Sequence, residues 1–326
     1  MSGYYWDNLA GLKNAWLLKY LSINSLNGYR SNMVITKLLG GLGNQMYQYA
    51  IGRSLALANG CELKLDKSAF DRDVIHSGYA LGSFNIVAGI AGSADVKSLA
   101  GSVHKIPRMI CHKLGMIGNT YVREKSFSFD PDLLKCRSPV YLEGYWQSYK
   151  YFEKFEEHIR LELTANQPLQ GKNLQLAQCI DDQNSVSVHV RRGDYISNPV
   201  ANRVHGFVGL SYYEVALACI SQEIDFPHFF VFSDDPLWAK NNLKFPGGVT
   251  FVEHNVGQAA FEDMRLMSQC KHHVMANSSF SWWAAWLDWT PNKKVFYPAN
   301  WFSSKLHNLS SLNPPEWIRL GPEGAH

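Results

Sequence analysis

The sequence lacks a block of charge of one sign, a long apolar run and paired cysteines. Its 31 lysines and arginines nearly balance 28 aspartates and glutamates, and the net charge of +3 is too small to indicate nucleic acid as the main partner. No window of about 18 residues is both apolar and free of charge, so no transmembrane helix is predicted. Any anion-binding role must therefore come from a few locally placed cations.

The cysteines indicate neither a disulfide framework nor a metal site. Six cysteines stand at positions 61, 111, 136, 179, 219 and 270, without a CxxC pair or metal-ligand spacing. This pattern is typical of reduced thiols in a cytosolic protein. His272 and His273 are adjacent and cannot both face one metal ion. We therefore expect no metal and no cofactor.

Residues 1–32 form an N-terminal extension that lacks the apolar block and cleavage site of a signal peptide. Apolar residues nevertheless recur at a helical period between Leu9 and Leu21. Such a helix could pack on the body of the protein or lie in a membrane interface. The expectation is a cytoplasmic protein with at most peripheral contact at the inner face of the membrane.

Beyond the extension, strands and helices alternate, which predicts an α/β fold. A strand at 33–39 is followed by a glycine turn, a helix and a second strand at 61–66; a further strand is expected at 139–143. The polar stretch at 165–173 resembles a linker. The prediction is two domains, 33–168 and 169–326, each a Rossmann-like parallel sheet, with a cleft between them. Ligands of such sheets bind beyond the carboxyl ends of the strands.

The stretch HVRRGDY, which follows a buried strand, is the most informative motif. His189, Arg191, Arg192 and Asp194 lie within six positions around a glycine bend. Two guanidinium groups suit a diphosphate, because each can hold phosphate oxygens bidentately. A lone arginine pair is more often a solvated surface turn, but this combination at a strand end is more specific.

The turn GGLGNQ stands between the first strand and its helix. It lacks the lysine of a P-loop and the third glycine of GxGxxG, so tight packing alone could explain Gly41 and Gly43. Its place at a helix start still offers N–H groups to an anion or a sugar oxygen. Asn44 and Gln45 add amide side chains there.

Two further motifs follow strands in the second half. ANSSFSWW places Asn277, Ser278, Ser279 and Phe280 at a strand-to-helix junction, where small polar residues both cap a helix and can hold phosphate. FSDD contributes Ser233 and Asp234 to the same rim, although capping of the helix after Pro236 would explain its acidic pair.

Together these motifs, with EDMRLMSQC before ANSSFSWW, resemble those of the α-1,2-fucosyltransferases in order and spacing, from about Met33 to about Trp301. The resemblance implies a GT-B-type fold, GDP-fucose as donor, a terminal β-galactoside as acceptor, inversion at the anomeric carbon and no required metal. GDP-fucose is then a co-substrate, and a galactose-terminated glycan is the other partner.

The resemblance also implies residue roles. His189 helps to hold the guanosine, Arg191 and Arg192 hold the diphosphate, and Asp263 reads the guanine edge. Ser279 touches phosphate, and Asn44 lies near the leaving group and the acceptor. The donor side also includes Gly41, Gly43, Gln45, Ser233, Asp234, Asn277, Ser278 and Phe280. By residue type, Asp194, Glu143 and His205 are candidates for a general base, and the base is left open.

Two other functions are consistent with parts of the sequence. A related GT-B enzyme could use another donor or form another linkage. A non-catalytic glycan-binding protein would use the 10 tryptophans and 16 tyrosines to stack on sugars. That second alternative does not explain the arginine pair or Asp263.

Overall fold

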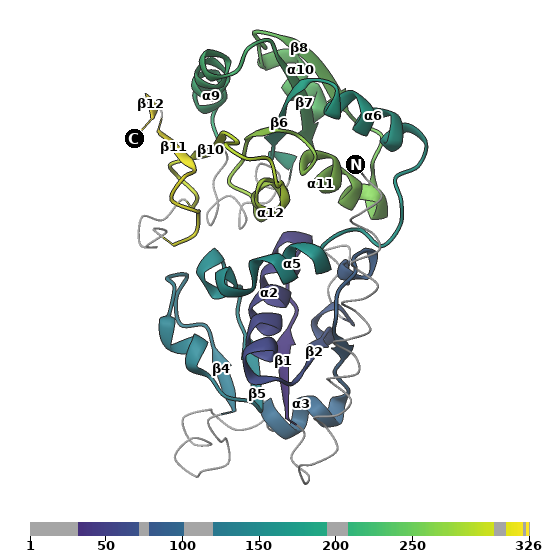
Figure 1. Ribbon diagram of the computed structural model, residues 1–326, viewed down its shortest axis with the longest axis vertical. Helices are drawn as coiled ribbons and strands as arrows, with labels where there is room; N and C mark the ends of the chain where they lie inside the picture. Colours follow the sequence, from purple (N-terminus) through teal and green to yellow (C-terminus); the bar gives the residue numbers. More distant parts are fainter. Residues whose placement is uncertain are drawn as a thin grey trace. The chain divides into compact units, whose positions relative to one another are not determined.

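The structure is a computed structural model, and it describes residues 32–71, 78–100, 120–193, 208–302, 311–321 and 324–325. The described elements belong to one compact unit, Met33–His326. The helix expected within residues 1–32 lies outside the described residues. The described part holds two β-sheets with helices, in agreement with the expected α/β class (Figure 1).

The first sheet has five parallel strands in the order β3-β2-β1-β5-β4. Its strands are β1 Met33–Lys37, β2 Glu62–Asp66, β3 Gly89–Ile90, β4 Tyr121–Arg123 and β5 Val140–Glu143. The helices of this part of the chain are α2 Leu42–Asn59, α3 Ser93–Ala100 and α5 Glu156–Glu162. Short 3₁₀ turns join them: η1 Ser68–Asp71, η2 Leu81–Ser83, η3 Pro131–Lys135, η4 Tyr149–Tyr151 and η5 Glu153–Phe155.

Alternation along β1 explains why helices cover both faces of this sheet. Val34 belongs to the large core cluster that contains the buried side of α2. Met33 and Ile35 instead pack with residues of α3. Because successive side chains of a strand point to opposite faces, one apolar strand supports two helical layers.

The second sheet has seven strands in the order β12-β11-β10-β9-β6-β7-β8. Its strands are β6 Asn184–Val190, β7 Pro227–Ser233, β8 Gly248–Val252, β9 His272–Val274, β10 Val295–Pro298, β11 Ile318–Gly321 and β12 Gly324–Ala325. The helices are α6 Gly171–Asp181, α9 Leu210–Glu223, α10 Pro236–Asn242, α11 Phe261–Met267 and α12 Ser279–Leu287, with the 3₁₀ turn η6 Gly257–Ala260.

The expected parallel pairing holds for every strand pair of this sheet except one. β12 runs antiparallel to β11. Only two residues separate these strands, and a parallel pair would need a crossover of a dozen residues or so. A connection this short therefore reverses the chain direction.

Strand β6 separates an apolar face from a polar one. Val186, Val188 and Val190 pack with the buried side of α9. Ser187 and His189 are buried on the opposite face, where the Ser187 hydroxyl lies 2.8 Å from Nδ1 of His273 on β9. This polar row leads along the strand to the arginine pair.

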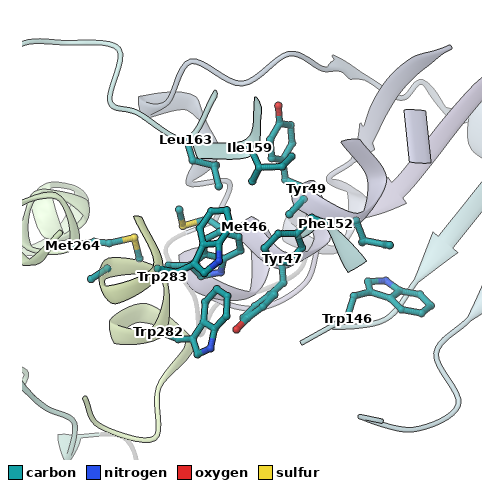
Figure 2. Packing of buried hydrophobic residues seen from close by; sticks show 14 of the residues in the cluster. Met46, Tyr47, Tyr49, Trp146, Phe152, Ile159, Leu163, Met264, Trp282 and Trp283 are labelled. Carbon is teal, nitrogen blue, oxygen red and sulfur yellow. The ribbon is translucent and has the colours of Figure 1, made fainter. Parts of the chain in front are cut away.

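Aromatic side chains pack α2 against α12. The Tyr47 ring lies 4.8 Å from the Trp282 ring and 5.0 Å from the Trp283 ring, measured between centroids. Phe152 stacks on Trp283 at 5.3 Å. Figure 2 shows these side chains gathered with Met46 between the two helices. Much of the high aromatic content is thus used in the core.

Candidate functional site

The glycine turn and the start of α12 are in direct contact. A Cβ atom at Gly43 would lie 2.6 Å from Ser279 Oγ and 2.8 Å from Phe280 N, too close for any side chain. The Trp283 indole donates a 2.9 Å hydrogen bond to the carbonyl of Gly43. Two motifs that were read separately in the sequence therefore form one surface.

The Gln45 side chain stabilises the glycine turn through three hydrogen bonds to backbone groups. Its Nε2 donates to the carbonyls of Gly40 at 3.0 Å and Gly78 at 2.8 Å, and its Oε1 accepts from Ala80 N at 2.9 Å. The side chain is fully buried. Backbone groups thus use both ends of the Gln45 amide for hydrogen bonds. Gln45 therefore stabilises the turn and is poorly suited to bind the donor directly.

Asn44 occupies the space beside Gly40. A Cβ atom at Gly40 would lie 2.7 Å from Asn44 Nδ2, and the φ of Gly40 is +74°, so glycine is needed here for both room and backbone conformation. Asn44 Oδ1 accepts a 2.8 Å hydrogen bond from Gln147 Nε2. Gly41, the N-cap of α2, has open space where a side chain would stand.

His189 is a neutral, buried group at the end of β6. Burial, followed by the nearby charge of Arg191, lowers the pKa of His189 to about 3. Its ring lies 5.6 Å from the Phe280 ring, and its Nδ1 has no hydrogen-bond partner among the residues that the structure describes. Tyr213 donates to the His189 carbonyl at 3.1 Å and thereby fixes the backbone. His189 can therefore serve a ligand as a hydrogen-bonding group, and it adds no positive charge.

The two acids of FSDD hold the arginine pair. Asp234 Oδ2 lies 3.1 Å from Arg191 Nη1, and Asp234 Oδ1 accepts from the backbone N of Arg192 at 2.8 Å. Asp235 Oδ2 lies 3.6 Å from Arg192 Nε. The Arg192 guanidinium also lies over the Trp238 ring, 3.9 Å from its centroid. These contacts fix both arginines at the carboxyl ends of β6 and β7.

The placement of Asp234 differs from the donor-binding role given to it from the sequence. Its carboxylate is used to position the arginines, and Gly193 leaves room for it, because a Cβ there would lie 3.1 Å from Asp234 Oδ2. Ser233 Oγ accepts from Asp235 N at 2.9 Å, and Asp235 caps α10 by accepting from Trp238 N. The capping interpretation of FSDD is thus correct for Asp235.

The start of α12 offers a hydroxyl and backbone N–H groups. Ser278 is the N-cap, and its Oγ accepts from Phe280 N at 3.3 Å. Asn277 is buried and donates to the Trp301 carbonyl at 3.3 Å. Ser279, one position into the helix, is partly exposed beside Gly43. The first N–H groups of a helix lack partners within it, so this end can receive an anion.

Asp263 lies on α11, and within the described residues its side-chain hydrogen bond is to Asn255 and to none of the groups above. Burial raises the pKa of Asp263 to about 7, and this effect outweighs the 2.8 Å hydrogen bond that its Oδ1 accepts from Asn255 Nδ2. Asn255 is held in turn by Asn173 of α6 through two amide hydrogen bonds. This carboxyl is therefore oriented and close to titration at neutral pH.

Of the three candidate general bases, the structure describes Glu143 alone. Asp194 and His205 lie outside the described residues. Glu143 is half-buried, which by itself would raise its pKa, but the Tyr121 hydroxyl and the Lys37 ammonium hold the pKa below the usual range. A carboxylate whose pKa is lowered is a poor proton acceptor, so Glu143 is disfavoured.

Gln147 and Trp238 were not identified from the sequence, although each contacts a predicted site residue. Gln147 stands in the aromatic turn after β5, where GYWQSY reads as a packing segment. Trp238 lies three positions after Asp235, where it reads as an ordinary helix residue. No sequence spacing relates Gln147 to Asn44 or Trp238 to Arg192, so the sequence alone does not indicate either contact.

Within the described ranges, no group of three or more His, Cys, Asp or Glu side chains could hold a metal ion. No helix in the same ranges is long and apolar enough to cross a membrane.

Comparison with known proteins identifies relatives over most of the chain. Residues 101–321 match the family model described as Glycosyl transferase family 11. The chain is 33% identical over 299 residues to an alpha-1,2-colitosyltransferase of Escherichia coli, covering 89% of this chain and 99% of that protein. It is 28% identical over 298 residues to the human galactoside alpha-(1,2)-fucosyltransferase 1, covering 87% of this chain and 74% of that protein.

A solved structure resembles the fold. A mutant of Arabidopsis thaliana FUT1 in complex with GDP superposes with a TM-score of 0.51 at 14% identity, covering 96% of this chain and 84% of that chain. At this identity the likeness concerns the fold alone. The α/β fold of GT-B type expected from the sequence is confirmed.

Proposed function

This chain belongs to glycosyltransferase family 11, and from that premise we propose that it transfers L-fucose from GDP-fucose to the 2-hydroxyl of a terminal β-galactoside. The product carries an α-1,2 linkage formed with inversion. The acceptor and linkage follow the name of the human relative, and the GDP held by the plant FUT1 structure supports the donor.

The observation that carries this proposal is the arginine pair held by Asp234 and Asp235 beside the neutral His189. A guanidinium has five N–H donors, so one arginine can hold an aspartate and a phosphate together. The acids fix the arginines in place before the donor arrives. Cations positioned in this way stabilise charge that develops in the transition state without reorganising at that moment.

In the proposed reaction, the bond between fucose C1 and the β-phosphate oxygen breaks, and GDP leaves with the electron pair. The acceptor 2-hydroxyl oxygen forms its bond to C1 from the opposite face, and its proton passes to the solvent. Arg191 and Arg192 stabilise the negative charge that grows on the β-phosphate. Ser279 and the first N–H groups of α12 add donors to the same anion.

Asp263 is proposed to select guanine. An ionised carboxylate can accept from both the N1–H and the exocyclic amine of guanine, and uracil offers no such pair. The hydrogen bond from Asn255 fixes the Asp263 carboxyl for this contact. His189, whose buried Nδ1 has no partner in the described part of the chain, is assigned to the nucleoside.

The deciding experiment incubates the purified protein with GDP-fucose and a panel of β-galactosides, with matching α-galactosides and β-glucosides as controls. We expect transfer to β-galactosides alone and a product whose NMR spectrum shows a fucose linked α to O2 of galactose. Transfer to another position, or GDP release without transfer to any galactoside, would reject the proposed acceptor and linkage.

A second donor is favoured by the 33% identity to the colitosyltransferase. Colitose is L-fucose without its 3-hydroxyl, so the same diphosphate and guanine contacts would serve either sugar. Competition between GDP-fucose and GDP-colitose in one reaction gives the ratio of their kcat/KM values. A ratio that favours GDP-colitose would assign the chain that donor and leave the transfer mechanism unchanged.

A further inference from the structure

The turn after β5, Gly144–Ser148, is fixed by side chains from other elements. Gln48 of α2 donates to the Gly144 carbonyl at 3.0 Å. The Glu124 carboxylate accepts from Tyr145 N at 2.7 Å and from Trp146 N at 3.0 Å. This support holds Trp146 at a φ of +57°, a left-handed conformation that is rare for a bulky residue. The turn therefore presents its next residue in one direction.

That next residue, Gln147, reaches across to the glycine turn. Its Nε2 donates to Asn44 Oδ1 at 2.8 Å, joining residues that follow the neighbouring strands β1 and β5. With Oδ1 engaged as an acceptor, Nδ2 is the polar atom of the Asn44 amide that remains, and Nδ2 hydrogen-bonds to no group in the described part of the chain. Asn44 is thereby set as an N–H donor.

Asn44 stands beside the site of the proposed leaving group. It follows Gly43, whose Cα packs against Ser279 at the start of α12. Gly40 has no side chain, and this leaves room for Nδ2. Asn44 therefore stands one residue from the contact between the glycine turn and the start of α12.

From this geometry we propose that Gln147 is a positioning residue, which fixes the Asn44 amide so that Nδ2 donates to the oxygen of the departing diphosphate. The proposal rests on the proposed function, since it concerns the same transfer. Asn44 touches the substrate, and Gln147 acts through Asn44. An amide free to rotate would present an oxygen to the departing anion about half of the time, which would be repulsive.

A structural role alone is a poor explanation for Gln147. The side chain is 8% exposed, and its Oε1 is buried and meets no hydrogen-bond partner within the described ranges. An unsatisfied buried oxygen costs free energy, which offsets much of the gain from the bond to Asn44. An apolar side chain of similar length should therefore serve folding equally well, and this makes the two roles separable.

The test measures kcat and KM for GDP-fucose, together with thermal unfolding, in Gln147→Met and Gln147→Glu. Methionine keeps the length and removes the donor; glutamate is an acceptor that would turn the Asn44 amide around. We expect kcat to fall about 10- to 100-fold in both, with KM nearly unchanged and the Gln147→Met midpoint close to that of the native chain. Gln178→Met, on the exposed side of α6, is the matched control.

The pair is then tested in the Asn44→Ala background, where Gln147→Met should cause no further loss of kcat, because the group that Gln147 positions is gone. Additive losses, or native kcat in Gln147→Met, would overturn the positioning role. A loss of kcat that only parallels unfolding would overturn it as well. If the native chain transfers no sugar from any GDP-linked donor, the proposed function itself has failed.

Discussion

Gly43 and Ser279 lie so close together that a methyl group on Gly43 would be 2.6 Å from the Ser279 hydroxyl oxygen. This contact joins the turn after β1 to the first turn of α12. Across the same junction, the Trp283 indole donates a hydrogen bond to the Gly43 carbonyl. The proposed phosphate site therefore depends on two segments that must fold together.

Gly43→Ala should destabilise the protein, because the added methyl group meets backbone atoms of Ser279 and Phe280 that cannot move aside easily. We expect a loss of about 1–3 kcal/mol in the free energy of unfolding, measured by urea denaturation. Gly41→Ala is the matched control, since no described atom lies within 4 Å of a Cβ at that position. Equal stability of the two variants would contradict the close packing.

Arg191→Ala and Arg192→Ala should each lower kcat by about 10²–10³-fold, because each removes a positioned cation from the developing charge on GDP. Steady-state kinetics with GDP-fucose measure this effect, and circular dichroism checks the fold. Arg137→Ala, at an exposed position, should leave kcat unchanged. Near-native turnover in both site variants would refute the diphosphate assignment.

Asp234→Asn should also lower kcat, although its carboxylate binds no substrate in this proposal. The change weakens the ion pair with Arg191 while keeping an oxygen that can accept from Arg192 N. We expect a smaller loss than for Arg191→Ala, and a double variant no worse than Arg191→Ala alone. Independent, multiplying losses would show that Asp234 acts by another route.

The affinity for GDP should depend on the charge of Asp263. Its pKa in the free protein is about 7, and guanine binds the ionised form, so the dissociation constant should rise as the pH falls below 7 and level off above it. Calorimetric titrations with GDP between about pH 5.5 and 8.5 measure this. Asp263→Asn should bind more weakly at high pH and keep only the smaller pH dependence that titration of the GDP β-phosphate causes. An unchanged affinity in that variant would exclude the guanine contact.

The alternation of strands and helices was predictable because its signals are local, but β3, α3 and β4, which lie between residues 89 and 123, were not predicted. Valines alternate with Ser187 and His189 along β6, and Gly41 and Gly60 stand at the two ends of the helix α2. The domain limits proposed from the sequence stay predictions. Because the strands were expected to be parallel, the motifs that follow β1, β6, β7 and β9 were also predicted to lie at the sheet edges where the strands end.

Partners far apart in the chain could not be predicted. Arg192 and Asp234 are 42 positions apart, Asn44 and Gln147 are 103 apart, and Gly43 and Trp283 are 240 apart. Asp234 and Asp235, which the structure places against the arginine pair, follow a different strand, β7, and nothing in the sequence indicates this pairing. Several nearby acids and amides were equally plausible by type, and only the packing selects among them.

By itself, the sequence determined which chemical groups stand at the strand ends, because residue type and strand period are local properties. Tertiary structure decided their states: burial makes His189 neutral and brings Asp263 close to titration, since both pKa values depend on atoms supplied by distant segments. It also set the direction of the Asn44 amide, because a hydrogen bond from Gln147 fixes which of its two ends is engaged.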